Sequence, residues 1–178
     1  MKNISLIIAF LMLGQFAFGQ WSEEEIKPFI QQTNREVEKS MTKLMESKKW
    51  NTKNDALIIE FTKDTMKIET IARLLFNEYY STFDMLNTIT YQIDEYDKLL
   101  NKYYKLLMGK LSEEKKVKFR NAQRVWLKYR DSEIGDALNA VTPEEGTMWR
   151  LSANHRILDI VKERVCTIYD FLTWQIGV

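Results

Sequence analysis

Apolar residues recur at helical spacing along nearly the whole chain, and short polar segments interrupt this pattern. The first helical stretch follows Ser22-Glu-Glu-Glu25, a pattern typical of a capping box. It continues to Trp50, where Asn51-Thr-Lys-Asn54 predicts a turn. Pro28 lies slightly too deep for the first turn, so it predicts a bend or a shifted start. We therefore expect a helix over residues 22–50.

The next segment, residues 55–108, contains neither glycine nor proline and carries apolar residues throughout. It is too long for one helix of a globular protein, so a break is expected within it. Ser81 is the best candidate, because its hydroxyl can cap a helix whose first turn contains Asp84. The segment predicts two helices, the second over residues 82–108.

Two further polar segments divide the second half of the chain. Gly109-Lys-Leu-Ser112 predicts a reversal, with Gly109 in the left-handed conformation and Ser112 capping a helix that reaches about Ala140. A connection this short requires antiparallel neighbours. Residues 142–146 predict another break, before a final helix over 148–172. The fold class predicted is all-α, an antiparallel bundle of about five helices.

The N-terminus has the pattern of a secretory signal peptide. A cationic start at Lys2 precedes an apolar run from Ile4 to Phe18, and Ala17-Phe-Gly19 provides small residues for cleavage. An uncleaved membrane anchor is the alternative, but the run is shorter than the ~20 residues that a spanning helix needs. We expect cleavage after residue 19 and a periplasmic or secreted protein without a transmembrane segment in its mature form.

Charge and composition exclude several function classes. The chain has 26 basic and 25 acidic residues, and loss of residues 1–19 removes one lysine, which leaves a net charge of zero. A nucleic-acid-binding protein needs a basic excess, so this class is disfavoured. The single histidine, His155, and the single cysteine, Cys166, do not suffice for a histidine-rich metal site or a Cys–His pair. No cofactor is expected.

The same two residues have ordinary structural interpretations. His155 is expected to be solvated or locally bonded, and Cys166, among apolar neighbours, is expected to be a buried, inert thiol, with a reactive thiol as the alternative. Paired carboxylates can catalyse glycoside hydrolysis. The acidic residues that could form such a pair lie on what we interpret as the polar, solvent-facing sides of helices. These candidates are Glu78, Asp94, Glu95 and Asp97. The chain is therefore predicted not to be an enzyme.

Residues 119–131 carry the most distinctive side chains. Gln123, Trp126 and Arg130 fall on one helical face, and the preceding helix presents Asn101 and Tyr104. An antiparallel hairpin places Gln123 within reach of Asn101 or Asp97, and Arg130 near Tyr91 and Asp94. We interpret this network as a clamp that fixes helix register, with ligand contact as the alternative. Trp126 is expected in the core, whereas Trp21, Trp149 and Trp174 are better candidates for exposure.

These residues resemble a known family. The Leu100-Asn101-x-x-Tyr104 helix, the turn, and the Gln123-x-x-Trp126-x-x-x-Arg130-Asp131 helix are similar to the lysozyme-inhibitor LprI-like family of exported bacterial proteins. Gly146-Thr-Met-Trp149 and Lys162-Glu-Arg164 look like its last helix. The resemblance covers residues 93–172, whereas residues 20–92 carry no recognisable motif and are expected to form one compact unit with them. Many members have two cysteines where this chain has Ile134 and the region of His155, so a disulfide is absent here.

The resemblance implies an exported, non-enzymatic binding protein whose partner is a lysozyme; the alternative is a structural or adaptor protein of the envelope. The shared motif residues are interpreted as determinants of the fold rather than as contacts. Contact with the partner is expected instead from charged residues in or beside the loops over 50–55, 109–112 and 141–147. The motif residues are Leu100, Asn101, Tyr104, Gln123, Trp126, Arg130 and Asp131, and the candidate contacts are Lys110, Glu144, Glu145 and Arg150.

Overall fold

The computed structural model describes residues 21–47, 53–137, 140 and 147–176, so the predicted signal peptide lies outside the described part. The described chain is helical and contains no strand, which confirms the all-α prediction. Five α-helices account for most of it, and a single π-helical turn, η1, follows the fourth. The bounds are α1 Glu23–Ser47, α2 Lys53–Glu78, α3 Thr82–Lys110, α4 Glu113–Ser132, η1 Glu133–Ala137 and α6 Thr147–Ile176.

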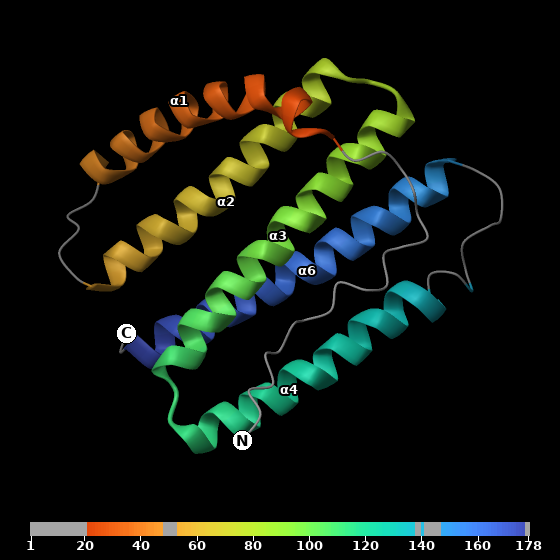
Figure 1. Cartoon of the computed structure of the whole chain (residues 1–178). Helices are drawn as coiled ribbons and strands as arrows, with labels where there is room; N and C mark the ends of the chain where they lie inside the picture. The colour runs from red at the N-terminus through yellow and green to blue at the C-terminus, as the bar shows by residue number, and fades with distance from the viewer. Residues whose placement is uncertain (1–20, 48–52, 138–139, 141–146, 177–178) are drawn as a thin grey trace.

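Consecutive helices run antiparallel, whereas α3 and α6 run in the same direction and pack closely against each other (Figure 1). Helix α2 packs against another side of α3, and α1 packs against the outer side of α2. Helix α4 lies on the other side of the molecule, where it returns the chain from the end of α3 toward the start of α6. No helix in the described ranges is long and apolar enough to cross a membrane.

The helix starts confirm the predicted caps. Ser22 and Glu25 form a reciprocal capping box: the Glu25 amide donates to Ser22 Oγ at 3.3 Å, and the Ser22 amide donates to Glu25 Oε2 at 2.8 Å. Ser81 Oγ accepts from the Asp84 amide at 3.1 Å, and Ser112 Oγ accepts from the Lys115 amide at 3.4 Å. Each cap satisfies a backbone amide that a helix leaves free at its N-terminus.

The end of α3 differs from the prediction. The helix continues through Gly109 to Lys110, and the chain then turns at Leu111 in an extended conformation, with φ −86° and ψ 147°. Gly109 is therefore not the left-handed residue after the helix. The cap at Ser112 suffices to start the next helix directly, so the reversal needs no glycine.

The end of α4 also differs from the prediction. Helix α4 ends at Ser132 and gives way to the π-turn η1, rather than continuing as an α-helix toward Ala140. A π-turn adds a residue to the helical repeat and so rotates the following side chains. Ile134, within this turn, packs against the core where related chains are expected to carry a cysteine. Pro28 lies inside the first turns of α1, which begins at Glu23.

The main core lies between α2, α3 and α6. Tyr103, Val165 and Ile168 have no exposed surface, and Leu100 is 2 % exposed. Phe61 of α2 stacks on Tyr169 of α6 at 3.9 Å, and Tyr103 packs edge-on against both rings. Because residues from the segment without a motif share this core with the motif-bearing helices, the two segments are packed together.

A carboxylate joins the same three helices at the edge of the core. Glu69 of α2 accepts hydrogen bonds from Tyr96 Oη at 2.6 Å and Gln92 Nε2 at 3.1 Å, both on α3. Lys162 of α6 pairs with the same carboxylate at 2.6 Å. Burial beside Glu69 raises the pKa of the Tyr96 hydroxyl, so this hydroxyl remains a donor at neutral pH.

Helix α1 is attached through a smaller apolar cluster. Trp21 packs on Tyr79 with ring centroids 4.7 Å apart, and its indole Nε1 donates to Thr88 Oγ1 at 3.2 Å. Ile26 packs with Ile71 and Leu75 of α2. Trp21 is therefore half-buried, contrary to the exposure expected for it, whereas Trp149 and Trp174 are exposed as expected.

Replacing Leu100 by alanine tests the α3–α6 core. Removal of this buried side chain should lower the free energy of unfolding by about 2–5 kcal/mol, through lost burial and the cavity left behind. Leu106→Ala on the same helix is the matched control, because that side chain is 39 % exposed and should change stability by less than about 1 kcal/mol. Chemical denaturation of the two variants measures the difference. Equal losses would show that the core does not lie where the structure puts it.

Candidate functional site

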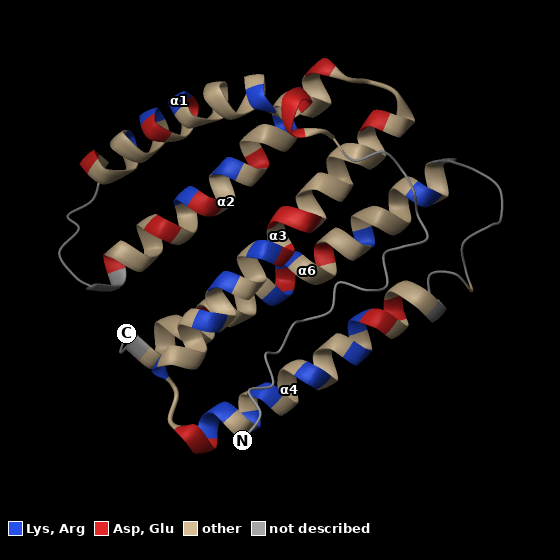
Figure 2. Cartoon of the chain, in the orientation of Figure 1, with Lys and Arg blue, Asp and Glu red and all other residues tan. Residues whose placement is uncertain are grey.

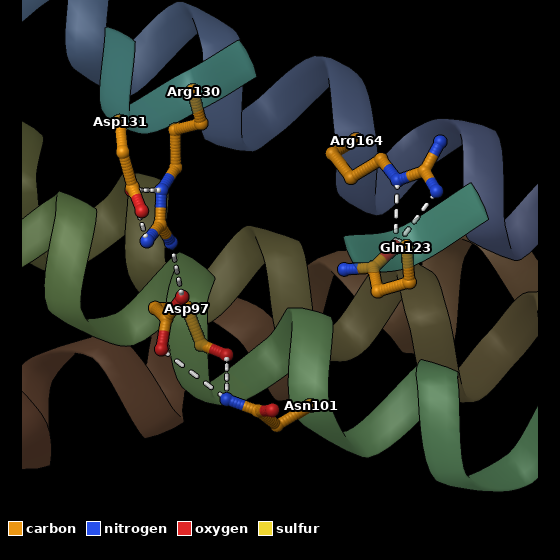
Figure 3. A network of polar contacts seen from close by, with 6 residues as sticks. All are labelled: Asp97, Asn101, Gln123, Arg130, Asp131 and Arg164. Carbon is orange, nitrogen blue, oxygen red and sulfur yellow. Dashed lines mark hydrogen bonds and ion pairs between the residues drawn. The ribbon is translucent and has the colours of Figure 1, made fainter. Parts of the chain in front are cut away.

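The polar residues of the α3–α4 hairpin form two separate clusters (Figure 3). In the first, the Arg130 guanidinium donates to Asp131 Oδ1 from Nε at 2.9 Å and from Nη2 at 2.7 Å. Its Nη1 lies 3.9 Å from Asp97 Oδ1 on α3. Asn101 Nδ2 donates to the Asp97 backbone oxygen at 2.9 Å and to Oδ2 at 3.2 Å. This cluster joins α3 to α4.

The second cluster joins α4 to α6. Gln123 is 2 % exposed, and its Oε1 accepts from Arg164 Nε at 3.0 Å and Nη2 at 2.7 Å. The same guanidinium lies 5.3 Å from the centre of the Trp126 ring and 6.0 Å from that of Phe119. Arg130 approaches the Trp126 ring as well, at 5.6 Å. The half-buried Trp126 indole therefore contacts both guanidinium groups. The negative face of the ring attracts each positive charge.

The predicted partner of Gln123 was wrong. The sequence placed it against Asn101 or Asp97, but its side chain points to α6 and binds Arg164. Arg130 lies 3.9 Å from Asp97, a neighbour that the sequence did not predict beside the expected Tyr91 and Asp94. Side chains of a helix lean toward its N-terminus, so the guanidinium of Arg130 reaches α3 about one turn further along than its backbone suggests.

Sequence reasoning missed the role of Arg164. The available signal was its position between Val161 and Val165, next to the apolar stripe of the last helix. A cation beside such a stripe needs a polar or aromatic partner when the helix packs. Partial burial lowers the pKa of the Arg164 guanidinium, although an arginine stays charged at neutral pH.

The remaining motif residues lie inside the same helix contacts. Leu100 is in the core, and Tyr104, half-buried, stacks on Phe119 with ring centroids 5.7 Å apart. Among the described residues Gln123 Nε2 has no hydrogen-bond partner. The side chains of Asn101 and Arg130 contact Asp97, and the Gln123 oxygen accepts from Arg164 of a neighbouring helix, an arrangement that suits a register clamp. We therefore keep the structural interpretation as our proposal for these residues.

The candidate contact residues do not meet at one place. Lys110 ends α3 and Arg150 lies in the first turn of α6; both are exposed, at opposite ends of the bundle (Figure 1). The 20 residues of α4 separate these ends, a length of roughly 30 Å. Glu144 and Glu145 lie outside the described residues. Next to Arg150, Trp149 is 53 % exposed, as expected, and Met148 is 67 % exposed.

The two residues considered for nucleophilic chemistry lie apart from these clusters. His155 is exposed, as expected. Cys166 was predicted to be buried but is exposed, because it lies beside Val165 on the outer flank of the α6 stripe. Partial desolvation and the nearby Asp170 carboxylate raise the pKa of its thiol, which disfavours the nucleophilic thiolate. In the described ranges no group of histidine, cysteine and acidic side chains is placed to hold a metal ion.

A large cleft, not anticipated from the sequence, runs between α1 and α3 over α2. Its volume is about 960 Å³, with Ile68 and Ile71 among the apolar residues that line it and charged side chains of both signs. Thr33, also on its lining, is 1 % exposed, and its hydroxyl has no partner within the described chain. Most of this cleft lies outside the motif-bearing helices.

Gln123→Ala tests the clamp between α4 and α6. Loss of the amide oxygen leaves the half-buried Arg164 guanidinium without its acceptor, which should cost about 1–3 kcal/mol of stability. Asn121→Ala, on the exposed face of the same helix, is the control and should stay within about 0.5 kcal/mol of the parent. Thermal unfolding followed by circular dichroism measures both. A Gln123 variant as stable as the control would exclude the clamp.

The carboxyl group of Asp97 supplies a pH test. Burial raises its pKa above 3.8 despite the attraction of Arg130 and the hydrogen bond from Asn101. Ionisation of Asp97 is therefore less favourable in the folded chain than in the unfolded chain. The folded state is most stable at pH values below the ordinary carboxyl pKa of 3.8, where Asp97 is protonated, and it loses stability as the pH rises through the pKa of Asp97 in the folded chain. The neutral variant Asp97→Asn escapes this loss.

As the pH rises from about 3.5 to 7, the melting temperature of Asp97→Asn should therefore increase relative to that of the parent protein. Melting curves at several pH values measure this shift, with Asp159→Asn at an exposed position of α6 as the control. A shift in the opposite direction would mean that pairing with Arg130 dominates over burial.

Comparison with protein families identifies the segment that contains both clusters. Residues 77–167 match the family model described as lysozyme inhibitor LprI. The match includes all of α3 and α4 and most of α6, and it begins earlier than the resemblance over 93–172 suggested. Comparison with curated proteins and with solved structures gives no match. Since the matched segment is more than half of the 178 residues, the chain belongs to the lysozyme inhibitor LprI family.

Proposed function

We propose that this protein is an exported, non-enzymatic binding protein that inhibits a lysozyme. The observation that carries the proposal is the family match over residues 77–167. The N-terminal pattern of a cationic start, an apolar run and a small-residue exit supports export to the periplasm or beyond the cell. Packing of α2 against α3 and α6 supports one compact unit that includes the unmatched segment.

The start of α6 is the surface that best suits such an inhibitor. Lysozyme cleaves its substrate between two carboxyl groups that flank the glycosidic bond, so an inhibitor must enter or cover that cleft. Met148, Trp149 and Arg150 are consecutive and exposed at one tip of the bundle. Tryptophan and arginine are the side chains most often found at energetic centres of protein interfaces, and a guanidinium can donate two parallel hydrogen bonds to a carboxylate.

The other candidate contacts divide between this tip and the far end. Glu144 and Glu145 precede the tip closely in sequence, and we propose that they meet basic groups at the rim of the cleft. Lys110 cannot enter the same cleft as Arg150, because the length of α4 separates them, while the two catalytic carboxyl groups of a glycosidase lie only about 5–10 Å apart. We therefore assign the inhibitory contact to the Arg150 end.

The cleft beside α1 favours a second candidate function, that of an envelope adaptor without effect on lysozyme. Its volume of about 960 Å³ and its unpartnered Thr33 hydroxyl offer room and a polar group for another molecule. It ranks second because the family match falls mainly on the other helices.

A turbidity assay with bacterial cell walls tests inhibition directly. A molar excess of the purified protein should suppress lysis by lysozyme, and Trp149→Ala or Arg150→Glu should weaken this suppression by about tenfold or more, as expected for an interface centre. Trp174→Ala is the matched control, since it removes an exposed tryptophan from the other end of the bundle. Gln123→Ala should lower the melting temperature while the folded protein still inhibits.

Full lysozyme activity in the presence of excess folded protein would exclude the inhibitor and leave the adaptor. Equal loss of inhibition in the Trp149 and Trp174 variants would instead exclude the α6 tip as the contact surface.

A further inference from the structure

An apolar pocket opens at the end of the bundle opposite the Trp149 tip. The last turn of α3, the first half of α4 and the C-terminal part of α6 enclose about 440 Å³ there. Leu107 and Leu111 come from α3 and its turn, Phe119 from α4, and Phe171 and Trp174 from α6. Burial of such apolar surface is favourable in water. We therefore expect a partner to cover this open pocket.

Aromatic side chains lead from the core of the protein to the rim of this pocket. Phe171 packs edge-on against Phe119 at 6.0 Å, and Trp174 packs against Phe171 at 5.3 Å. The Trp174 side chain is 65 % exposed. A tryptophan that is anchored on one side and exposed on the other is typical of the membrane–water interface, where its apolar ring and polar N–H match the two environments.

Basic residues surround the pocket and continue along α4. Lys115 and Lys118 line the pocket itself. Helix α4 has seven basic and three acidic residues, and no acidic residue lies between Lys115 and Arg130 (Figure 2). Glu114 pairs with Lys118 at 2.6 Å and Glu113 with Lys116 at 2.7 Å, but the two glutamates and Lys118 are largely exposed, so solvent weakens these pairs. The surface beside the pocket therefore keeps a positive balance in a chain whose net charge is only +1.

We propose that this end of the bundle docks on a membrane surface rich in anionic phospholipid. Trp174 enters the boundary between headgroups and acyl chains, and the pocket beside it receives apolar lipid atoms. Lys115 and Lys118 bind lipid phosphates, and the basic residues of α4 add a longer-range attraction. A second copy of the chain fits less well, because a symmetric pairing through this end would bring the lysines of both copies together.

Such docking goes beyond lysozyme inhibition and is compatible with it. The Trp149 tip lies at the other end of α4, roughly 30 Å away by the length of that helix, so it faces away from a membrane bound by Trp174. The protein would thus present its inhibitory tip outward from the membrane to which it is docked.

Co-sedimentation of the full chain with vesicles tests this proposal. Vesicles with phosphatidylglycerol and phosphatidylcholine should bind the protein at least tenfold more tightly than pure phosphatidylcholine vesicles, and added salt should weaken the binding. Lys115→Ala with Lys118→Ala should weaken it by about tenfold or more, since each lysine near an anionic surface contributes about fivefold. Trp174→Ala should also weaken it about tenfold.

Two matched variants serve as controls. Lys39→Ala with Lys43→Ala removes the same charge from exposed positions of α1, and Trp149→Ala removes an exposed tryptophan from the other tip. Both should leave vesicle binding within about twofold of the parent, as surface changes away from the contact do. Melting temperatures of all variants show that loss of binding does not come from unfolding.

Equal binding to neutral and anionic vesicles, or equal loss in the α4 and α1 lysine variants, would overturn the proposal. It would also be overturned by binding of free fatty acid without binding of vesicles, or by concentration-dependent dimers that Trp174→Ala abolishes. The readout is independent of lysozyme, so failure of vesicle binding leaves the inhibitor proposal intact, and the reverse holds as well.

Discussion

The parallel packing of α3 against α6 is the contact on which the rest of the structure depends. Tyr103, Val165 and Ile168 have no exposed surface at this contact. Two helices that run in the same direction cannot be joined by a tight turn, so the intervening chain must travel back along the bundle. Helix α4 provides this return. Only a narrow face of α4 packs against the other helices, and Gln123 is the one buried residue on that helix.

This difference between the core-forming helices and α4 explains where the charged residues lie. The core-forming helices α2 and α3 pair polar groups across the edge of their contact, as Glu69 does with Gln92 and Tyr96. Helix α4 faces solvent over most of its circumference and can concentrate basic residues there without burying them. The two ends of the bundle differ in turn: one exposes Met148, Trp149 and Arg150, and the other exposes Trp174 beside lysines. We propose different partners for these ends because their surfaces differ, although both carry an exposed tryptophan.

Local features of the fold were predictable from the sequence, whereas non-local partners were not. The caps at Ser22, Ser81 and Ser112 depend on residues three positions away, so their sequence patterns suffice to identify them. The helix count followed from the same breaks. The partner of Gln123 lies 41 residues away on α6, and hairpin geometry alone favoured the nearer helix α3. Cys166 was misplaced because a rotation of about 100° per residue carries it from the buried side of Val165 to the surface. Within the candidate site, the sequence identified the motif residues and the exposed Trp149 and Trp174, but not the pocket, which arises only where three helix ends meet.

The attachment of α4 has a consequence for how the molecule opens. This helix is held to its neighbours by Gln123 and Arg164, by the Asp97–Arg130 pair, and by the half-buried rings of Phe119 and Trp126. Little of its surface is inaccessible to water, whereas α3 is buried along its length. Parts of a protein with few buried contacts open at lower free energy than the core. Amide protons of α4 should therefore exchange with solvent in excursions that leave α2, α3 and α6 closed, which makes this helix a separate unit of local unfolding within an otherwise cooperative bundle.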